Sequence, residues 1–167
     1  MLQRYNIEIC STKMLKAKID EGLIKDDNAC IVCSSYDVRL DTKSIYNTLM
    51  LRFDDITNRN DRNSFSNVYA EQIHFFIEDL KQINKLYVCC DSGQSRSSAI
   101  AAAIYRYNGL NENVIWKNPQ YSPNILVYEI LCKKLNLNNS KLRLKYKKYL
   151  NNKSLKNVIK KQRVKNS

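Results

Sequence analysis

The sequence has 167 residues, of which 44% are hydrophobic and 26% are charged, and this ordinary composition fits one globular domain rather than a disordered chain. It has no apolar run of about 18 residues and no secretory signal, so we expect a cytoplasmic protein without a membrane span. The net charge of +12 is uneven: residues 1–132 hold 15 Lys or Arg and all 16 acidic residues, whereas residues 133–167 hold 13 Lys or Arg and no acid.

Short apolar runs alternate with helix-forming segments along the chain. The predicted strands are 5–10, 28–36, 48–53 and 85–90, and the predicted helices are 11–22, 68–83, 96–109 and 122–135. From residue 140 onward, a lysine-rich segment predicts an amphipathic helix that frays into a disordered end. The alternation predicts an α/β fold, with a central, mostly parallel sheet of four to five strands flanked by helices. We expect a domain over residues 1–138 and a basic helix or tail over residues 139–167.

The six cysteines lie singly within apolar segments, so no disulfide framework is expected. Cys30 and Cys33 form a CxxC pair, which raises the alternative of a zinc or redox site. A zinc site needs a second pair of ligands, and the only histidine, His74, is far away in the sequence. We therefore expect structural cysteines, no metal and no cofactor.

Two polar segments follow predicted strands. The acid pair Asp54 and Asp55 comes after the strand at 48–53, and the turn at 90–96 comes after the strand at 85–90. Ligands of parallel sheets bind at the carboxyl ends of the strands. The two segments are therefore expected to form one site.

Five residues separate a cysteine from an arginine in the turn CDSGQSRS. Such a short link makes a tight loop, in which Gly93 permits a positive φ or a close ligand. Backbone N–H groups at a helix N-terminus bind anions, and Arg96 offers a planar fork to phosphate oxygens. The same groups would lower the pKa of Cys90 from about 8.5, so a histidine base is not needed. The spacing alone also fits a buried thiol and a surface arginine, but the preceding strand, the glycine, Ser97 and the following helix favour a functional loop.

The segment CDSGQSRSSA resembles the phosphate-binding loop of protein tyrosine phosphatases, and its flanks resemble the small dual-specificity type of bacterial or phage-like proteins. In that group an FDD stretch, a helix, the loop VxCxxGxSRSxAxAAAI and a late Y-x-PN-x-x-x-Y segment occur in this order. Here these are Phe53-Asp54-Asp55, the helix 68–83, Val88 to Ile104, and Tyr121-Ser122-Pro123-Asn124 with Tyr128. The resemblance covers roughly residues 5–135 and implies the fold and the activity of that superfamily.

The resemblance implies a two-step reaction in which Cys90 forms a phosphocysteine while Arg96 and the loop amides stabilise the phosphoryl oxygens. An aspartic acid protonates the leaving oxygen and later deprotonates a water molecule. Asp55 is favoured for this role, with Asp54 as the alternative, and Ser97 eases the departure of the thiolate. The phosphate is expected to bind Asp54 and the loop residues Asp91, Ser92, Gly93, Gln94 and Ser95.

One residue departs from the family pattern, because Cys89 stands where a histidine usually precedes the nucleophile. That histidine orients the loop in the family, so its absence leaves open a catalytically weak, phosphate-binding pseudophosphatase. Cys89 is expected to pack in the core on the opposite side of the strand from Cys90. A weaker alternative is a redox role, in which Cys89 or Cys10 protects an oxidised Cys90.

The expected substrates are phosphorylated proteins or other phosphate esters, with phosphotyrosine, phosphoserine and phosphothreonine left open. The basic segment raises a second alternative, a polynucleotide 5′-phosphatase or triphosphatase that uses the same loop. In that case the segment would bind RNA or another polyanion; otherwise it is a solvated helix.

Overall fold

The computed structural model describes residues 5–38, 40 and 47–165, and every statement below refers to them. In chain order the elements are β1 (Asn6–Ser11), α1 (Thr12–Asp20), β2 (Asn28–Ser34), β3 (Asn47–Arg52), α2 (Asn67–Asp79), β4 (Lys85–Cys90), α3 (Arg96–Tyr107), α4 (Asn113–Trp116), α5 (Ile125–Lys134) and α6 (Lys141–Lys165).

The strands form one sheet in the order β1-β4-β2-β3, and each neighbouring pair is parallel. The prediction of an α/β fold with a parallel sheet flanked by helices is therefore confirmed, with four strands in the described residues. The register sets Ser11 and Cys33 beside Cys90. The carboxyl ends of all four strands consequently meet at one edge of the sheet.

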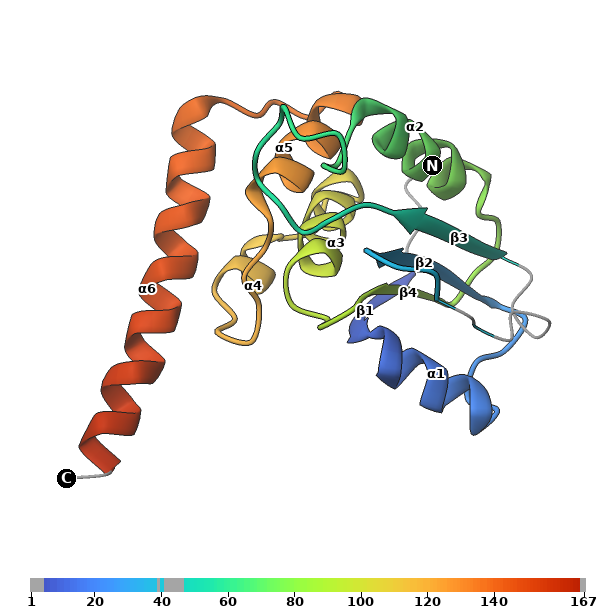
Figure 1. Cartoon of the computed structure of the whole chain (residues 1–167), viewed down its shortest axis with the longest axis horizontal. Coiled ribbons are helices and arrows are strands. Elements are labelled where there is room, and N and C mark those ends of the chain that lie inside the picture. Colours follow the sequence, from blue (N-terminus) through green and yellow to red (C-terminus); the bar gives the residue numbers. More distant parts are fainter. Residues whose placement is uncertain (1–4, 39, 41–46, 166–167) are drawn as a thin grey trace.

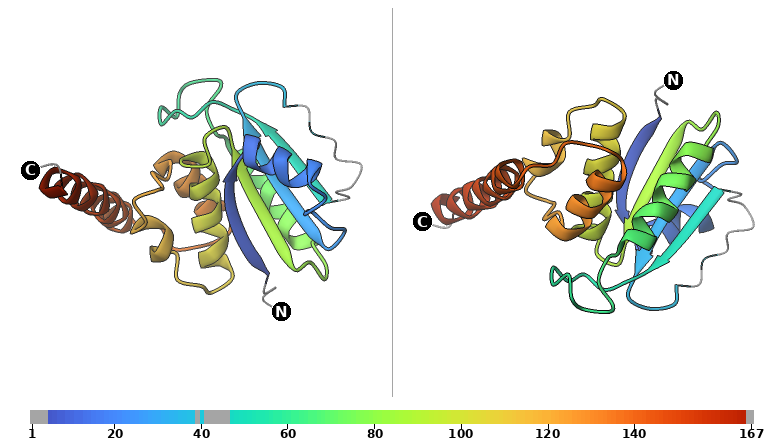
Figure 2. Two further views of the ribbon diagram at one scale, coloured as in Figure 1. Left: turned by 90° about the horizontal axis from the view of Figure 1, so that it is seen from below. Right: turned by 90° about the horizontal axis from the view of Figure 1, so that it is seen from above.

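Helices cover both faces of the sheet. In Figure 1, α1 lies below the sheet and α2 above it, and Figure 2 shows the same two layers from below and above. On the α1 face, Leu15 packs against Cys10, Cys30 and Cys89. The other face carries the larger core, which is formed with α2, α3 and α5 and contains Cys90. Cys89 and Cys90 thus face opposite sides of the sheet, as expected.

Several helix boundaries differ from the prediction because of local capping. Helix α5 begins after Pro123 rather than at Ser122, since the Asn124 side chain accepts hydrogen bonds from the N–H groups of Leu126 (3.0 Å) and Val127 (3.2 Å). Helix α2 ends at Asp79, because the next residue has an extended backbone. The one-turn helix α4 was not predicted.

The lysine-rich segment forms one continuous helix to Lys165, so the expected fraying is wrong within the described residues. The prediction of an amphipathic helix also fails: Leu150 is buried, but Leu142, Tyr146 and Tyr149 are exposed. The helix docks mainly through polar contacts. Lys147 Nζ lies 2.7 Å from Glu112 Oε1, and Asn151 Nδ2 donates to the Tyr121 carbonyl at 2.8 Å. None of the described helices has the length and apolar character of a membrane span.

Candidate active site

The turn after β4 is a tight loop that packs against the end of β1. Gly93 has a φ of +72°, and a Cβ at this position would lie 2.6 Å from the backbone nitrogen of Ser11. A side chain would therefore meet both an unfavourable backbone conformation and a backbone atom that cannot move aside. This close approach explains why the loop contains a glycine at this point.

Cys90 is the last residue of β4 and is only 1% exposed. Its Sγ lies 3.1 Å from the Ser97 hydroxyl. Burial by itself raises the pKa of the Cys90 thiol. Hydrogen bonds from the Ser97 hydroxyl and from the backbone N–H groups of Ser97, Ser95 and Gly93 outweigh the burial, so the pKa lies below its ordinary value. The predicted activation of the thiol by loop amides thus has a geometric basis, without a histidine.

Arg96 begins α3 and is only 4% exposed. Its Nη1 donates to the Phe53 carbonyl at 2.7 Å and to the Ser35 hydroxyl at 3.1 Å, so the residues that follow β3 and β2 hold the guanidinium. Its Nε is buried and has no hydrogen-bond partner among the described residues. A buried donor without an acceptor is costly, and a phosphate oxygen would satisfy it.

The Asp91 carboxylate contacts the Arg96 guanidinium within the loop. It forms an ion pair with Arg96 at 2.5 Å and accepts a hydrogen bond from the Ser34 hydroxyl at 2.8 Å. Burial raises the pKa of Asp91, but Arg96 and Ser34 outweigh this effect and lower it. The sequence did not predict this ion pair, because Asp91 was assigned to substrate binding with the rest of the loop.

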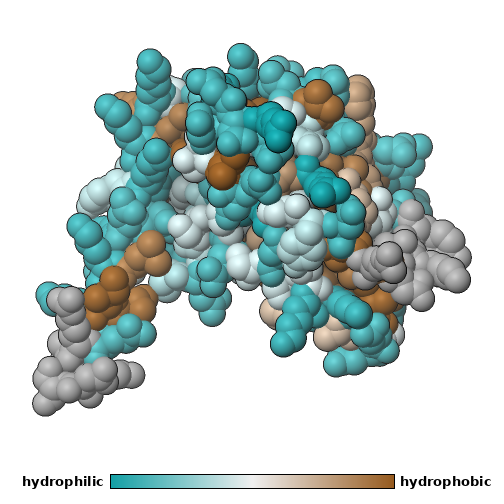
Figure 3. All heavy atoms as spheres, in the orientation of Figure 1, coloured by the Kyte–Doolittle hydropathy of each residue, from teal (hydrophilic) through white to brown (hydrophobic). Residues whose placement is uncertain are grey.

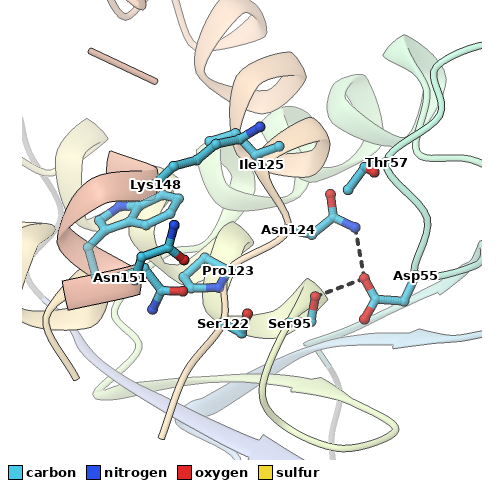
Figure 4. Close-up of a pocket in the computed structure, with 11 residues that line it drawn as sticks. Asp55, Thr57, Ser95, Ser122, Pro123, Asn124, Ile125, Lys148 and Asn151 are labelled. Atoms are coloured by element: carbon cyan, nitrogen blue, oxygen red, sulfur yellow. Dashed lines mark hydrogen bonds between the residues drawn. The ribbon is translucent and has the colours of Figure 1, made fainter. Parts of the chain in front are cut away.

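The two candidate acids lie differently. Asp55 Oδ1 accepts a hydrogen bond from the Ser95 hydroxyl at 2.8 Å and another from Asn124 Nδ2 at 2.7 Å, as the dashed lines in Figure 4 mark. The side chain of Asp54 makes no hydrogen bond to the loop among the described residues; its backbone N–H donates to the Asn63 carbonyl at 2.8 Å, and its carbonyl accepts from the Ile56 N–H at 3.0 Å. The contact with Ser95 sets Asp55, not Asp54, against the loop.

A residue that sequence reasoning did not assign to the site holds the acid and the loop together. Asn124 is 4% exposed; its amide donates to Asp55, and its backbone N–H donates to the Ser95 carbonyl at 3.2 Å. Two positions earlier, the Ser122 N–H donates to the Gln94 carbonyl at 3.0 Å. The signal was present in the late PN segment of the family pattern. The side chains of Ser92 and Gln94 are exposed.

The other thiols are buried. Cys10 and Cys89 have their sulfurs 3.0 Å apart on the α1 face, away from Cys90, so the geometry does not favour their protecting an oxidised Cys90. The CxxC thiols point to opposite faces of β2, Cys30 to the α1 side and Cys33 to the larger core. Burial raises the pKa of Cys30 to about 12 and that of Cys33 further. These two are core residues, as expected.

No protein-family model matches the chain, and no curated protein matches it in sequence. Among solved structures it is similar to the crystal structure of PTPMT1 in complex with PI(5)P, with a TM-score of 0.44 and 11% identity over 93% of this chain and 96% of that chain. The Yvh1 phosphatase domain from Chaetomium thermophilum has a TM-score of 0.45 and 13% identity over 88% of this chain and 90% of that chain.

The crystal structure of Tk-PTP in the active form has a TM-score of 0.45 and 15% identity over 91% of this chain and 95% of that chain. The three are structures of the protein tyrosine phosphatase type, the superfamily that the loop sequence resembles.

Proposed function

We propose that the protein hydrolyses phosphate monoesters, phosphotyrosine among them, through a phosphocysteine formed on Cys90. The observation that carries this proposal is the surroundings of the sulfur. Hydrogen bonds from Ser97 and from three loop N–H groups lower the pKa of the Cys90 thiol, and the buried Nε of Arg96 has no acceptor among the described residues. A thiolate beside unfilled donors suits attack on a phosphate.

In the first step the Cys90 thiolate attacks phosphorus, a P–S bond forms, and the bond to the leaving oxygen breaks. Arg96 and the loop amides stabilise the equatorial oxygens. Asp55, as the carboxylic acid, gives its proton to the leaving oxygen. The hydrogen bonds from Ser95 and Asn124 both go to Oδ1, so Oδ2 is the oxygen available for the proton.

In the second step a water molecule attacks phosphorus and gives a proton to the Asp55 carboxylate. The P–S bond breaks, phosphate leaves, and the thiolate is restored. The Ser97 hydroxyl, 3.1 Å from Sγ, stabilises the negative charge that returns to sulfur. We assign Asp55 rather than Asp54 as the acid because of its contact with the loop.

Hydrolysis of 4-nitrophenyl phosphate, and of phenyl phosphate with its poorer leaving group, tests the proposal with wild type, Cys90→Ser, Asp55→Asn and Asp54→Asn in parallel. We expect Cys90→Ser to abolish turnover and Asp55→Asn to lower kcat by about 10²-fold or more for substrates with a poor leaving group, while Asp54→Asn retains most activity. Full activity of Cys90→Ser would overturn the mechanism. A larger loss in Asp54→Asn than in Asp55→Asn would overturn only the choice of acid. A wild type that binds phosphate without hydrolysing any ester would favour the pseudophosphatase alternative.

A further inference from the structure

A hollow of about 350 Å³ adjoins the candidate active site and is built by a different part of the chain. Figure 4 shows Asp55 on one side of it and Lys148 and Asn151 of α6 on the other. The rest of its lining comes from α4, the 122–125 segment, Thr57 and Ser95. The residues that line it include Asp55, Ser95, Trp116, Asn124, Lys148 and Asn152.

The hollow is continuous with the loop that is proposed to bind the scissile phosphate. Asp55, Ser95 and Asn124 line it, and the same three residues are joined by the hydrogen bonds that set the acid against the loop. A substrate whose phosphate sits over Cys90 would therefore extend past Asp55 toward α6.

The wall opposite Asp55 offers positive charge and donors. Lys148 is exposed and makes no ion pair among the described residues. Trp116 is 1% exposed, and its Nε1 is a buried donor without a partner among them. Asn152 adds an exposed amide. An anion would take hydrogen bonds from Lys148 and Asn152 at little cost, because both side chains are exposed.

The positive charge continues beyond the hollow along α6. Lys148 and Asn152 also line a neighbouring hollow of about 530 Å³ together with Lys145 and Lys156. Figure 3 shows hydrophilic side chains along the upper and middle parts of the column that α6 forms, and hydrophobic ones toward its lower end. Cations that recur along one helix suit a ligand with repeated negative charges, such as a chain of phosphates, better than a single carboxylate.

We propose that the hollow between Asp55 and α6 binds a second phosphate group of the same substrate, with Lys148 as its principal cation. This inference rests on the proposed function, because it takes the first phosphate to lie over Cys90. The substrates favoured would then be phosphorylated chains with a further phosphate near the scissile one, such as the 5′ end of an oligonucleotide.

The test compares kcat/KM for the dinucleotide pApA, which has a 5′-terminal phosphate and one internucleotide phosphate, with kcat/KM for 4-nitrophenyl phosphate, at low salt. Lys148→Gln should lower the ratio of the two by about two- to fivefold, as expected for one exposed ion pair. The matched control is Lys160→Gln, which removes the same charge from an exposed position of α6 and should leave the ratio unchanged. An unchanged ratio in Lys148→Gln would overturn the subsite while leaving the phosphatase proposal intact.

Binding provides the readout that does not depend on turnover. Trp116 is the single tryptophan and lines the hollow, so its fluorescence in the Cys90→Ser variant should report binding of the dinucleotide. We expect tighter binding of the dinucleotide than of adenosine 5′-monophosphate, and loss of that difference when Lys148→Gln is added. If the wild type hydrolyses no ester but this difference is found, the subsite stands and the phosphatase proposal fails. A pair of phosphopeptides with Glu or Gln beside the phosphoresidue tests whether the hollow binds a carboxylate instead. If the Glu peptide binds more tightly than the Gln peptide while the dinucleotide shows no advantage over the monophosphate, the assignment to a phosphate is overturned.

Discussion

At the scale of single residues, the protonation of Cys90 is governed by groups that can be removed one at a time. The Ser97 hydroxyl is the largest of the contributions that lower its pKa. We predict that Ser97→Ala raises this pKa, so the iodoacetamide reaction of Cys90 shifts to higher pH. Below the midpoint of the pH profile, alkylation of Cys90 should be about tenfold slower in Ser97→Ala than in wild type, because a hydrogen bond to the charged thiolate is lost. Peptide mass spectrometry would identify the alkylated residue; equal pH profiles in the two proteins would contradict the prediction.

The ion pair between Asp91 and Arg96 predicts that two kinetic constants, KM and kcat, both fall when Asp91 is replaced, each for a different reason. Asp91→Asn removes a negative charge beside the guanidinium, so KM for 4-nitrophenyl phosphate should fall by about threefold. The value of kcat should fall as well, because Arg96 loses a contact that orients it. Steady-state kinetics separates the two effects. A rise in KM would show that Asp91 assists substrate binding, as the sequence alone suggested.

The loop glycine allows a test with an internal control. Gly93 and Gly22 both have a positive φ, +72° and +67°, but a Cβ at Gly22 would have nothing within 4 Å. Gly22→Ala should therefore cost only the backbone strain, about 1–2 kcal/mol. Gly93→Ala should lower the free energy of unfolding further and abolish activity, because its Cβ would meet β1. Denaturant unfolding of both variants measures the difference, and equal losses would contradict the close approach.

Sequence reasoning at this scale can propose a site where the residues are contiguous in the chain, but it misses contacts that form only on folding. The loop from Cys90 to Arg96 is continuous in the chain, so its residues and spacing carry the prediction. Asn124 lies 69 residues after Asp55 and joins it only in the folded chain. The Asp91 ion pair was missed for a related reason: loop spacing does not say where a side chain turns.

At the scale of elements, the strands and long helices were predictable because apolar periodicity persists over six residues or more. Helix α4 spans four residues, too few for such a pattern. The contact face of α6 was not predictable either. It is held by Lys147, which is 2% exposed and lies 2.7 Å from Glu112. A lysine in a basic run is ordinarily expected to be solvated.

This buried ion pair gives a prediction about the docking of α6. Lys147→Met should lower the free energy of unfolding by about 3–5 kcal/mol, because the Glu112 carboxylate loses its main partner in the interior. The double variant Lys147→Met with Glu112→Gln should recover much of that loss, since no unpaired charge remains. Denaturant unfolding and hydrogen exchange in α6 would measure both. A double variant as unstable as the single one would contradict the role of the ion pair.

At the scale of the whole molecule, the uneven charge has a structural meaning that composition alone could not give. The basic excess of residues 133–167 falls largely on α6, and one turn of that helix brings Lys148 to the wall of the hollow opposite Asp55. The sequence showed the charge but not its position, because the loop and α6 are about fifty residues apart in the chain. The fold places them at the same edge of the molecule.

The most direct test of the central claim is the detection of phosphorus on Cys90 during turnover. A mixture of the enzyme and 4-nitrophenyl phosphate is quenched in acid within milliseconds and digested, and the peptide that contains Cys90 is examined by mass spectrometry. The account predicts that this peptide gains the mass of one phosphoryl group and loses it as substrate is exhausted. Turnover with no phosphoryl group on Cys90, in a protein whose Cys90→Ser variant remains active, would contradict it.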